Sequence, residues 1–191
     1  MSSARSRSDP APLTTEAAAA QIAAAAFAVR AAPRILIDGR SGSGKTTLAQ
    51  ELVRLRPDVQ LLALDSVYPG WDGLRAGAEI ARVDVLEPHA AGRLARWRRW
   101  DWGSSTWAEA HEIDPDLPLL VEGSGLLTPP IAALGDVRVW LDADAAERRR
   151  RAIARDGATY EPHWERWSRQ EEEHLAAHRP ADAATLRLRV R

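Results

Sequence analysis

A glycine-rich stretch near the start of the chain has the residues needed to hold the phosphates of a nucleotide. It runs from Gly39 to Thr46 and fits the pattern G-x-x-x-x-G-K-[ST]. Glycines let the backbone wrap closely around an anion, so that successive N–H groups can point at phosphate oxygens. The pattern predicts contacts to ATP from Gly39, Ser41, Gly42, Ser43, Gly44, Lys45, Thr46 and Thr47.

Two side chains of this stretch carry its chemistry. Lys45 is the only lysine among the 26 basic residues, and all the others are arginine. Composition bias explains the excess of arginine, but it does not explain why the exception falls inside the glycine loop. A compact ammonium suits the β- and γ-phosphates, so we expect Lys45 to bind them and to be catalytic. The hydroxyl of Thr46 is expected to be a ligand of Mg²⁺.

Apolar segments around the loop predict the elements that position it. Residues 34–38 ("RILID") have the composition of a short buried strand, and residues 45–55 ("KTTLAQELVRL") place leucines on one face of a helix. Further strands are predicted at 59–65, 117–123, 137–144 and 185–190. Near-continuous apolar strands separated by helices indicate an α/β fold with a mostly parallel central sheet covered on both faces.

The chain length suits one domain. Its 191 residues are enough for a compact α/β domain and short for two. Residues 1–13 are rich in Ser, Arg and Pro and are predicted to be a disordered tail. Residues 14–191 are predicted to form a single phosphate-loop domain, with an N-terminal helix over 14–32 that Thr14 or Thr15 caps.

Charge and composition narrow the class of protein. A net charge of -1 gives no reason to expect nucleic acid or membrane as a partner, and the absence of Cys excludes disulfides and zinc–thiolate sites. The longest apolar run near the N-terminus, residues 22–29, is too short to span a bilayer. We therefore expect a cytoplasmic monomer or homodimer whose partner is a small-molecule substrate.

The loop alone does not separate kinases from GTPases and ATPase motors. A GTPase should carry an N-K-x-D motif, which a chain with a single lysine inside the glycine loop does not contain. Motor ATPases are usually larger and have a long apolar strand that ends in Asp, whereas the strand predicted at 117–123 ends near Glu122. Small size and an Arg-rich helix predicted from about residue 145 to 155 favour a small-molecule kinase.

Four segments together resemble the uridine kinase-like group of phosphate-loop kinases, which includes phosphoribulokinase and pantothenate kinase relatives. They are "IDGRSGSGKTTLA", "LDSVY" (64–68), "LLVEG" (119–123) and "LDADAAERRRRAIARD" (141–156), and they span about two thirds of the chain in the group's order. The resemblance implies a three-layer P-loop NTPase fold with an Arg-rich lid over residues 145–175. It also implies Mg²⁺-dependent phosphoryl transfer from ATP to a nucleoside or similar sugar-bearing metabolite.

The resemblance assigns roles to two acidic residues. Asp65 matches the group's Asp that accepts the proton of the attacking hydroxyl and contacts the substrate, and a hydroxyl acceptor benefits from such a base. The pair Asp65–Ser66 could instead form a turn or a helix cap. Glu122 would act on Mg²⁺ through water or orient the acceptor, and it could otherwise pair with an arginine.

Three arginines of the predicted helix match the group's lid pattern. Arg148, Arg151 and Arg155 lie on one helical face. The resemblance implies that Arg148 and Arg151 are catalytic and that Arg155 binds ATP, because arginines can stabilise charge on the transferring phosphoryl group. A solvated face paired with the acidic residues 171–173 is the alternative.

A tryptophan-rich segment, residues 96–107 ("RWRRWDWGSSTW"), is expected to form the acceptor pocket. Asp101 and Trp102 are similar to the aromatic–Asp pair with which the group holds ribose hydroxyls, since a carboxylate can accept two hydrogen bonds from a diol. Tyr68 and Trp71 are expected to contribute to the same pocket. Burial of the tryptophans in the core is the alternative.

Two further questions stay open at the level of sequence. Arg98 or Arg99 could bind an acceptor phosphate, which would make the protein a nucleoside monophosphate kinase, and ATP could also be bound without phosphoryl transfer. A helix with Trp164, Trp167 and Glu171 on one face has no counterpart in the group's motifs. It could cover adenine, close over the acceptor or simply pack against the domain.

Overall fold

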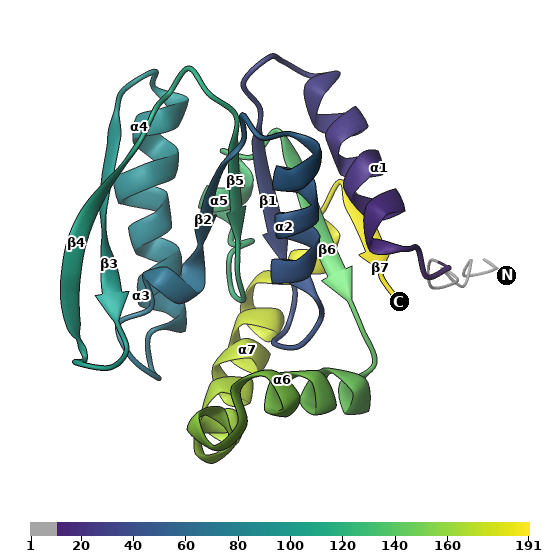
Figure 1. Cartoon of the computed structure of the whole chain (residues 1–191), viewed down its shortest axis with the longest axis vertical. Helices are drawn as coiled ribbons and strands as arrows, with labels where there is room; N and C mark the ends of the chain where they lie inside the picture. Colours follow the sequence, from purple (N-terminus) through teal and green to yellow (C-terminus); the bar gives the residue numbers. More distant parts are fainter. Residues whose placement is uncertain (1–10) are drawn as a thin grey trace, which may run out of the picture.

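A five-stranded parallel sheet forms the centre of the molecule (Figure 1), with the strand order β2-β5-β1-β6-β7. The computed structural model describes residues 11–191, without the side chains of residues 155, 156, 158 and 159. The predicted tail therefore lies almost entirely outside the described residues. The strands of the sheet are β1 (Arg34–Asp38), β2 (Gln60–Ala63), β5 (Leu119–Glu122), β6 (Val137–Asp142) and β7 (Leu186–Arg189). Each neighbouring pair is parallel, as predicted.

Helices cover both faces of this sheet and complete three layers. Successive residues of a strand point to opposite faces. Ile35 and Ile37 of β1 pack with the helices of one face, and Leu36 joins the core of the other. The first face carries α1 (Thr15–Phe27) and α2 (Lys45–Leu55), and the helices on the second side are α3 (Leu74–Ile80), the π-helix η2 (Ala81–Leu86), α4 (Glu87–Ala90) and α5 (Pro129–Ala132). The α/β fold class is confirmed.

The first helix is shorter than predicted. Thr14 caps α1 by accepting a hydrogen bond from Ala17 N at 3.2 Å, as expected of an N-cap threonine. The helix ends at Phe27 rather than near residue 32. No helix within residues 11–191 has both the length and the apolar character needed to cross a bilayer.

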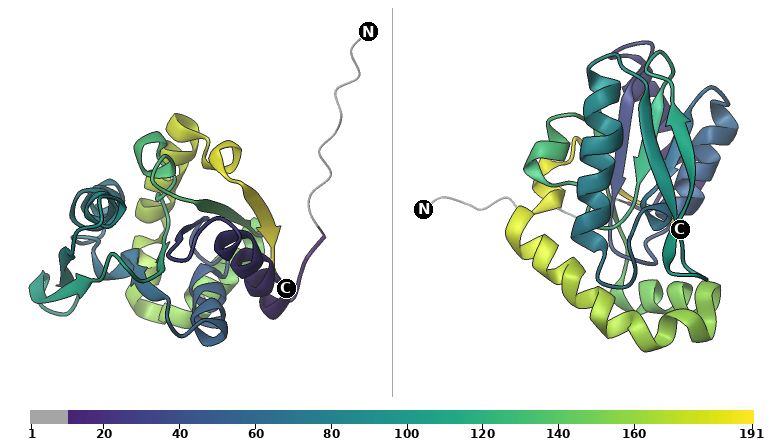
Figure 2. Two further views of the ribbon diagram at one scale, coloured as in Figure 1. Left: turned by 90° about the horizontal axis from the view of Figure 1, so that it is seen from above. Right: turned by 90° about the vertical axis from the view of Figure 1, so that its left-hand side faces the viewer.

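A β-hairpin that the sequence did not predict lies outside the second layer (Figure 2, right). It pairs β3 (Ala95–Asp101) with β4 (Thr106–Ile113) in antiparallel fashion. Ala95 and Trp97 are buried against η2, and the intervening Arg96 is exposed. The hairpin carries most of the tryptophan-rich segment, so the aromatic residues of this segment belong to a strand pair and its turn.

The C-terminal third places two helices below the carboxyl ends of the strands (Figure 1). They are α6 (Ala145–Tyr160) and α7 (Trp164–His178), joined by the short η3 (Glu161–His163) and followed by α8 (Pro180–Ala183). Gly157 interrupts α6 with φ +52°. These helices correspond to the predicted lid region, and the movement of a lid stays a prediction.

Candidate active site

The glycine loop joins β1 to α2 and lines a cavity. Gly42 and Gly44 have φ of +79° and +99°, which glycine adopts without the cost that a side chain would bring. A Cβ atom on Gly42 would lie 2.1 Å from the carbonyl oxygen of Arg148, so the close approach of α6 also requires glycine there. The cavity has a volume of about 360 Å³ and lies at the N-terminus of α2, where the helix favours an anion.

Lys45 has its ammonium group held inside the loop. Nζ donates hydrogen bonds to the carbonyl oxygens of Gly39 at 2.7 Å and Arg40 at 3.2 Å, and to Oγ of Ser124 at 3.2 Å. All three partners are uncharged, and the residue lines the cavity. These hydrogen bonds orient the ammonium group of Lys45 but do not neutralise its positive charge. The charge is therefore available to attract a phosphate group.

Thr46 and Glu122 bring oxygen atoms together at the floor of the same cavity. The Thr46 hydroxyl donates to Oε1 of Glu122 at 3.0 Å, and Glu122 is buried at the end of β5. Hydroxyl and carboxylate oxygens suit Mg²⁺. Within the described residues, no group of three or more acidic or histidine side chains could hold a metal alone. Mg²⁺ at Thr46 and Glu122 would therefore rely on waters and nucleotide phosphates for its other ligands, as it commonly does.

Asp65 stands where this cavity meets a second one. The predicted strand ends earlier than expected, and Asp65 lies in the 3₁₀ turn η1 (Leu64–Ser66) just after β2. Its exposed carboxylate lines both the phosphate-loop cavity and a neighbouring cavity of about 560 Å³. Ser41 of the loop is also common to both. A hydroxyl bound in the second cavity would therefore meet a carboxylate base beside the phosphate loop.

The second cavity is walled by aromatic rings. They are Tyr68, Trp71, Trp100, Trp102, Tyr160 and Trp167. The rings of Trp71 and Tyr160 stack with their centroids 5.5 Å apart, and the ring centroids of Trp71 and Trp102 are 4.9 Å apart. Such walls favour a flat ring, with a few polar groups to orient it. The structure therefore brings the predicted residues Tyr68, Trp71 and Trp102 together beside Asp65.

Tyr68 has a structural role in this wall. Its hydroxyl donates to the carbonyl oxygen of Ser124 at 2.7 Å, and the side chain is buried. Burial raises the pKa of this hydroxyl well above its ordinary value, and the negative charge of Asp65 raises it further. Tyr68 therefore stays protonated near neutral pH and acts as a hydrogen-bond donor in this wall.

Arg98 and Asp101 do not line the aromatic cavity. Arg98 donates to the carbonyl oxygens of Ala108 and Trp107 along the hairpin. The Asp101 carboxylate accepts hydrogen bonds within the β3–β4 turn, from Ser104 Oγ at 2.8 Å and Gly103 N at 3.1 Å. Both hydrogen bonds lower the pKa of Asp101, and the one from Ser104 has the larger effect. The geometry assigns both residues to the hairpin and gives no support to their predicted contacts with substrate.

Arg99 is the arginine of this segment that lines the cavity. Its guanidinium donates to both carboxylate oxygens of Glu109, at 2.6 and 3.1 Å. This bidentate pairing already uses the geometry with which arginine binds an oxyanion. Because Arg99 is paired with Glu109, it is not free to bind the phosphate of an acceptor.

The three arginines of the predicted lid have different surroundings. Arg151 lines the phosphate-loop cavity and donates to Glu147 at 2.7 Å. Arg148 is buried and donates to the carbonyl oxygen of Ser41 at 3.4 Å, and burial lowers the pKa of its guanidinium, as does the charge of Arg40. The side chain of Arg155 lies outside the described residues, so its role in binding ATP stays a prediction.

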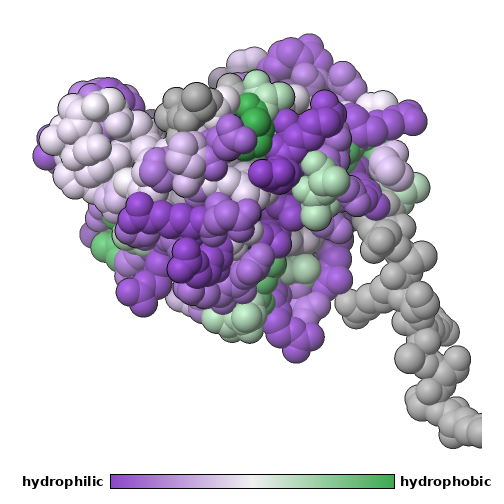
Figure 3. Space-filling model, turned by 90° about the horizontal axis from the view of Figure 1, so that it is seen from below, coloured by the Kyte–Doolittle hydropathy of each residue, from purple (hydrophilic) through white to green (hydrophobic). Residues whose placement is uncertain are grey.

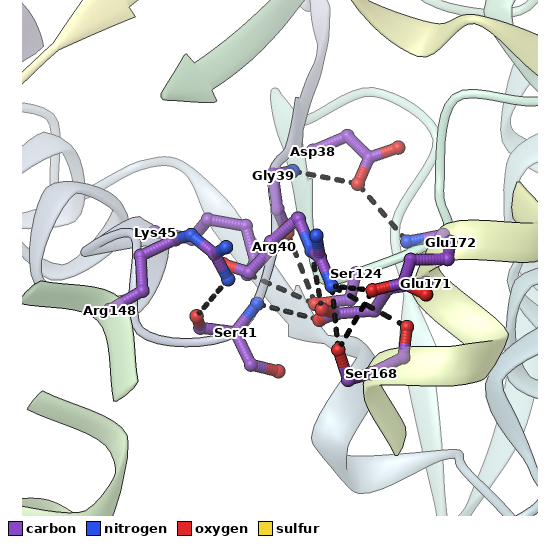
Figure 4. Close-up of polar contacts among 11 residues, drawn as sticks. Asp38, Gly39, Arg40, Ser41, Lys45, Ser124, Arg148, Ser168, Glu171 and Glu172 are labelled. Atoms are coloured by element: carbon purple, nitrogen blue, oxygen red, sulfur yellow. Dashed lines mark hydrogen bonds and ion pairs between the residues drawn. The ribbon is translucent and has the colours of Figure 1, made fainter. Parts of the chain in front are cut away.

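Polar residues that the sequence did not single out hold the loop from outside (Figure 4). Ser124, just after β5, receives Lys45 and donates to Gly39 O at 3.1 Å. The buried Asp38 accepts from Gly39 N at 2.7 Å and pairs with His174 of α7 at 3.1 Å. Ser124 lies 85 residues from Gly39 and His174 lies 136 residues from Asp38, so neither partner belongs to the short motif that contains the loop.

The end of the molecule that carries the phosphate loop and α7 presents a mainly hydrophilic surface (Figure 3). Six aromatic rings and the polar side chains of Asp65, Ser66 and Arg99 together line the second cavity. This distribution is typical of a small-molecule site, which buries its ligand among apolar walls and admits it from water.

No protein-family model and no curated protein matches the sequence. Solved structures do match its fold. A possible uridine kinase from Bacillus stearothermophilus superposes with a TM-score of 0.66 and 18% sequence identity, over 90% of this chain and 97% of the other. The chain has the fold of phosphate-loop kinases. A candidate fructose transport system kinase from Silicibacter sp. TM1040 matches this kinase fold with a TM-score of 0.54 and 16% identity, over 92% and 98% of the two chains. The resemblance to the uridine kinase-like group is confirmed for the fold.

Proposed function

We propose that this protein transfers a phosphoryl group from ATP to a hydroxyl group of a small molecule bound in the aromatic cavity. One observation carries the proposal: Asp65 lines the phosphate-loop cavity and the aromatic cavity at once. Catalysis of phosphoryl transfer consists mostly of positioning the reactants and stabilising charge. A carboxylate at the junction of two sites is placed to orient the acceptor and receive its proton.

In the proposed reaction, the acceptor oxygen forms a bond to the γ-phosphorus and its proton goes to the carboxylate of Asp65. The bond between the γ-phosphorus and the bridging oxygen breaks, and ADP carries away the electron pair. Lys45 and Arg151 stabilise the negative charge on the phosphoryl oxygens. Mg²⁺, held through Thr46 and Glu122, would supply charge neutralisation for the triphosphate.

The acceptor is proposed to be a nucleoside or another metabolite that joins a flat ring to a hydroxyl-bearing sugar. Trp71 and its aromatic neighbours offer stacking surfaces. The only charged residues that line this cavity in the described chain are Asp65 and Arg99, and Arg99 is paired with Glu109. A hydroxyl acceptor fits this charge pattern better than a monophosphate, which would lie near Asp65 and need a free cation.

The experiment incubates the purified protein with MgATP and a panel of nucleosides, nucleoside monophosphates and sugars. The release of ADP is measured for each member of the panel. Transfer to a nucleoside or related hydroxyl acceptor supports the proposal. Preferred transfer to monophosphates would replace it with a nucleoside monophosphate kinase. ATP binding without transfer to any member of the panel would favour a nucleotide-binding protein that does not transfer phosphate.

A further inference from the structure

Two helices hold the backbone of Ser41 in the phosphate loop (Figure 4). Its N–H donates to Oε1 of Glu171 in α7 at 2.6 Å, and its carbonyl oxygen accepts from Nη1 of Arg148 in α6 at 3.4 Å. The two partners are nearly inaccessible to solvent, with exposed fractions of 3% for Glu171 and 7% for Arg148. The loop therefore does not set its own conformation alone, because side chains more than 100 residues away fix its third residue.

The carboxylate of Glu171 lies close to a loop that is built to attract anions. Its second oxygen, Oε2, accepts from Nε of Arg40 at 3.0 Å, and Arg40 also donates to Ser168 Oγ at 2.7 Å. A buried carboxylate is costly unless it is paired and hydrogen-bonded. Arg40 neutralises Glu171, which allows the carboxylate to bind the N–H of Ser41 without setting an unpaired negative charge beside the phosphate site.

The same face of α7 reaches the aromatic cavity. Trp167 lies four residues before Glu171, so the two side chains are neighbours on one helical face. Trp167 lines the aromatic cavity, and Glu171 contacts the loop. One helix face thus provides a wall of the proposed acceptor site and a support for the proposed nucleotide site.

We propose that Glu171 is a positioning residue, which fixes the phosphate loop through the N–H of Ser41 in the conformation that binds the nucleotide. The inference rests on the proposed function, because it assumes that the loop binds ATP and ADP. It concerns the binding step, which can be measured without knowing the acceptor.

The test is calorimetric titration of the full-length protein with MgADP. In Glu171→Ala the N–H of Ser41 loses its partner and Arg40 keeps Ser168 and the exposed Glu172. We expect the Kd to rise about tenfold, as for the loss of a charge-assisted hydrogen bond. Glu171→Gln keeps an oxygen for Ser41 but not the charge, and we expect a rise of about threefold. The matched control is Glu172→Gln, whose carboxylate meets Arg40 at 3.3 Å from a 65% exposed position and should change the Kd less than about twofold.

Thermal melting of each variant separates positioning from stability. A purely structural role of Glu171 would lower the Tm while leaving the Kd for MgADP unchanged in the folded variant, and that result would overturn the inference. If Glu171→Ala does not fold, the near-isosteric Glu171→Gln decides: binding equal to wild type overturns the inference, and weaker binding supports it. If the wild-type protein binds MgADP but phosphorylates no acceptor, the kinase proposal is wrong. The comparison of the Kd for MgADP between wild type and the Glu171 variants then still tests the role of Glu171. Wild-type protein that does not bind MgADP would overturn both.

Discussion

The indole N–H of Trp102 donates a hydrogen bond to the backbone carbonyl oxygen of Asp65, at 2.8 Å. Trp102 belongs to the turn of the β3–β4 hairpin, and Asp65 to the 3₁₀ turn after β2. The hairpin is therefore joined to the residue whose carboxylate lines both cavities. This contact gives the hairpin a role in placing the proposed base, besides that of forming an aromatic wall.

Replacing Trp102 by phenylalanine keeps a ring in the wall and removes the hydrogen-bond donor. We expect kcat/KM for the acceptor to fall about fivefold, since a neutral hydrogen bond is worth about 1 kcal/mol, and the affinity for MgADP to stay unchanged. Trp107→Phe is the matched control, because Trp107 lies on the same hairpin but does not line the cavity. An equal loss in both variants would show that the hairpin acts only through its overall packing.

Asp65→Asn should separate binding from transfer. The amide keeps the shape of the side chain but no longer accepts the proton of the hydroxyl. We expect kcat to fall by about 10²- to 10⁴-fold, the usual contribution of a general base, with the Kd for MgADP within twofold of wild type. Asp72→Asn, an exposed carboxylate that pairs with Arg166, serves as the control. Near-normal turnover of Asp65→Asn would remove Asp65 from the role of base.

Local patterns in the sequence were sufficient to predict the central sheet and the phosphate loop. The strand Arg34–Asp38 and the helix Lys45–Leu55 have the predicted bounds, because unbroken apolar residues and helical leucine spacing are short-range signals. The hairpin was not predicted. In β4 most side chains are exposed or half-buried, so the segment lacks the alternation of apolar and polar residues that marks a half-buried strand.

The parts of the site that were not predicted depend on long-range contacts. Glu171 was expected on one helical face with Trp164 and Trp167, and all three are buried on that face of α7. Its contact with Ser41 spans 130 residues and has no motif. Asp101 shows the opposite case: its aromatic neighbours suggested a substrate ligand, whereas Ser104 and Gly103 show a carboxylate that stabilises a turn, a common role for Asp.

Glu147 restrains Arg151, which lines the phosphate-loop cavity. It pairs with Arg150 and with Arg151, and these hydrogen bonds lower the pKa of the Glu147 carboxyl to about 2. The folded pKa lies below the ordinary value, so the pairing is present above that ordinary value and is lost only as the pH falls through about 2. Titration of Glu147 should therefore not affect nucleotide binding near neutral pH.

Replacing Glu147 by glutamine should release Arg151 toward the phosphates. We expect the affinity for MgATP to rise about two- to threefold, since an exposed ion pair of this kind is worth less than about 1 kcal/mol. Glu165→Gln, on the neighbouring helix, is a control for the change in net charge. Weaker binding of MgATP by Glu147→Gln, measured by titration, would instead mean that the pair holds Arg151 in its productive position.

Asp38 stabilises the strand end from which the phosphate loop begins. Its carboxylate accepts hydrogen bonds from the backbone N–H groups of Gly39, Gly125 and Leu127, at 2.7 to 3.1 Å, and it is 1% exposed. Asp38→Ala would leave these buried donors without a partner. We expect the free energy of unfolding to fall by at least about 3 kcal/mol, measured by urea denaturation. A loss below about 1 kcal/mol would show that water replaces the carboxylate, and the exposed Asp58→Ala provides the reference.

Phosphorus NMR of the product would show whether the phosphoryl group is transferred to a hydroxyl of a molecule bound in the aromatic cavity. MgATP and the acceptor that gives the fastest release of ADP would be incubated either with purified wild-type protein or with purified Asp65→Asn. We expect a phosphomonoester signal that grows with wild type and is nearly absent with Asp65→Asn. A new phosphoanhydride signal besides those of ATP and ADP, or a monoester formed equally fast by Asp65→Asn, would overturn the proposed transfer to a hydroxyl.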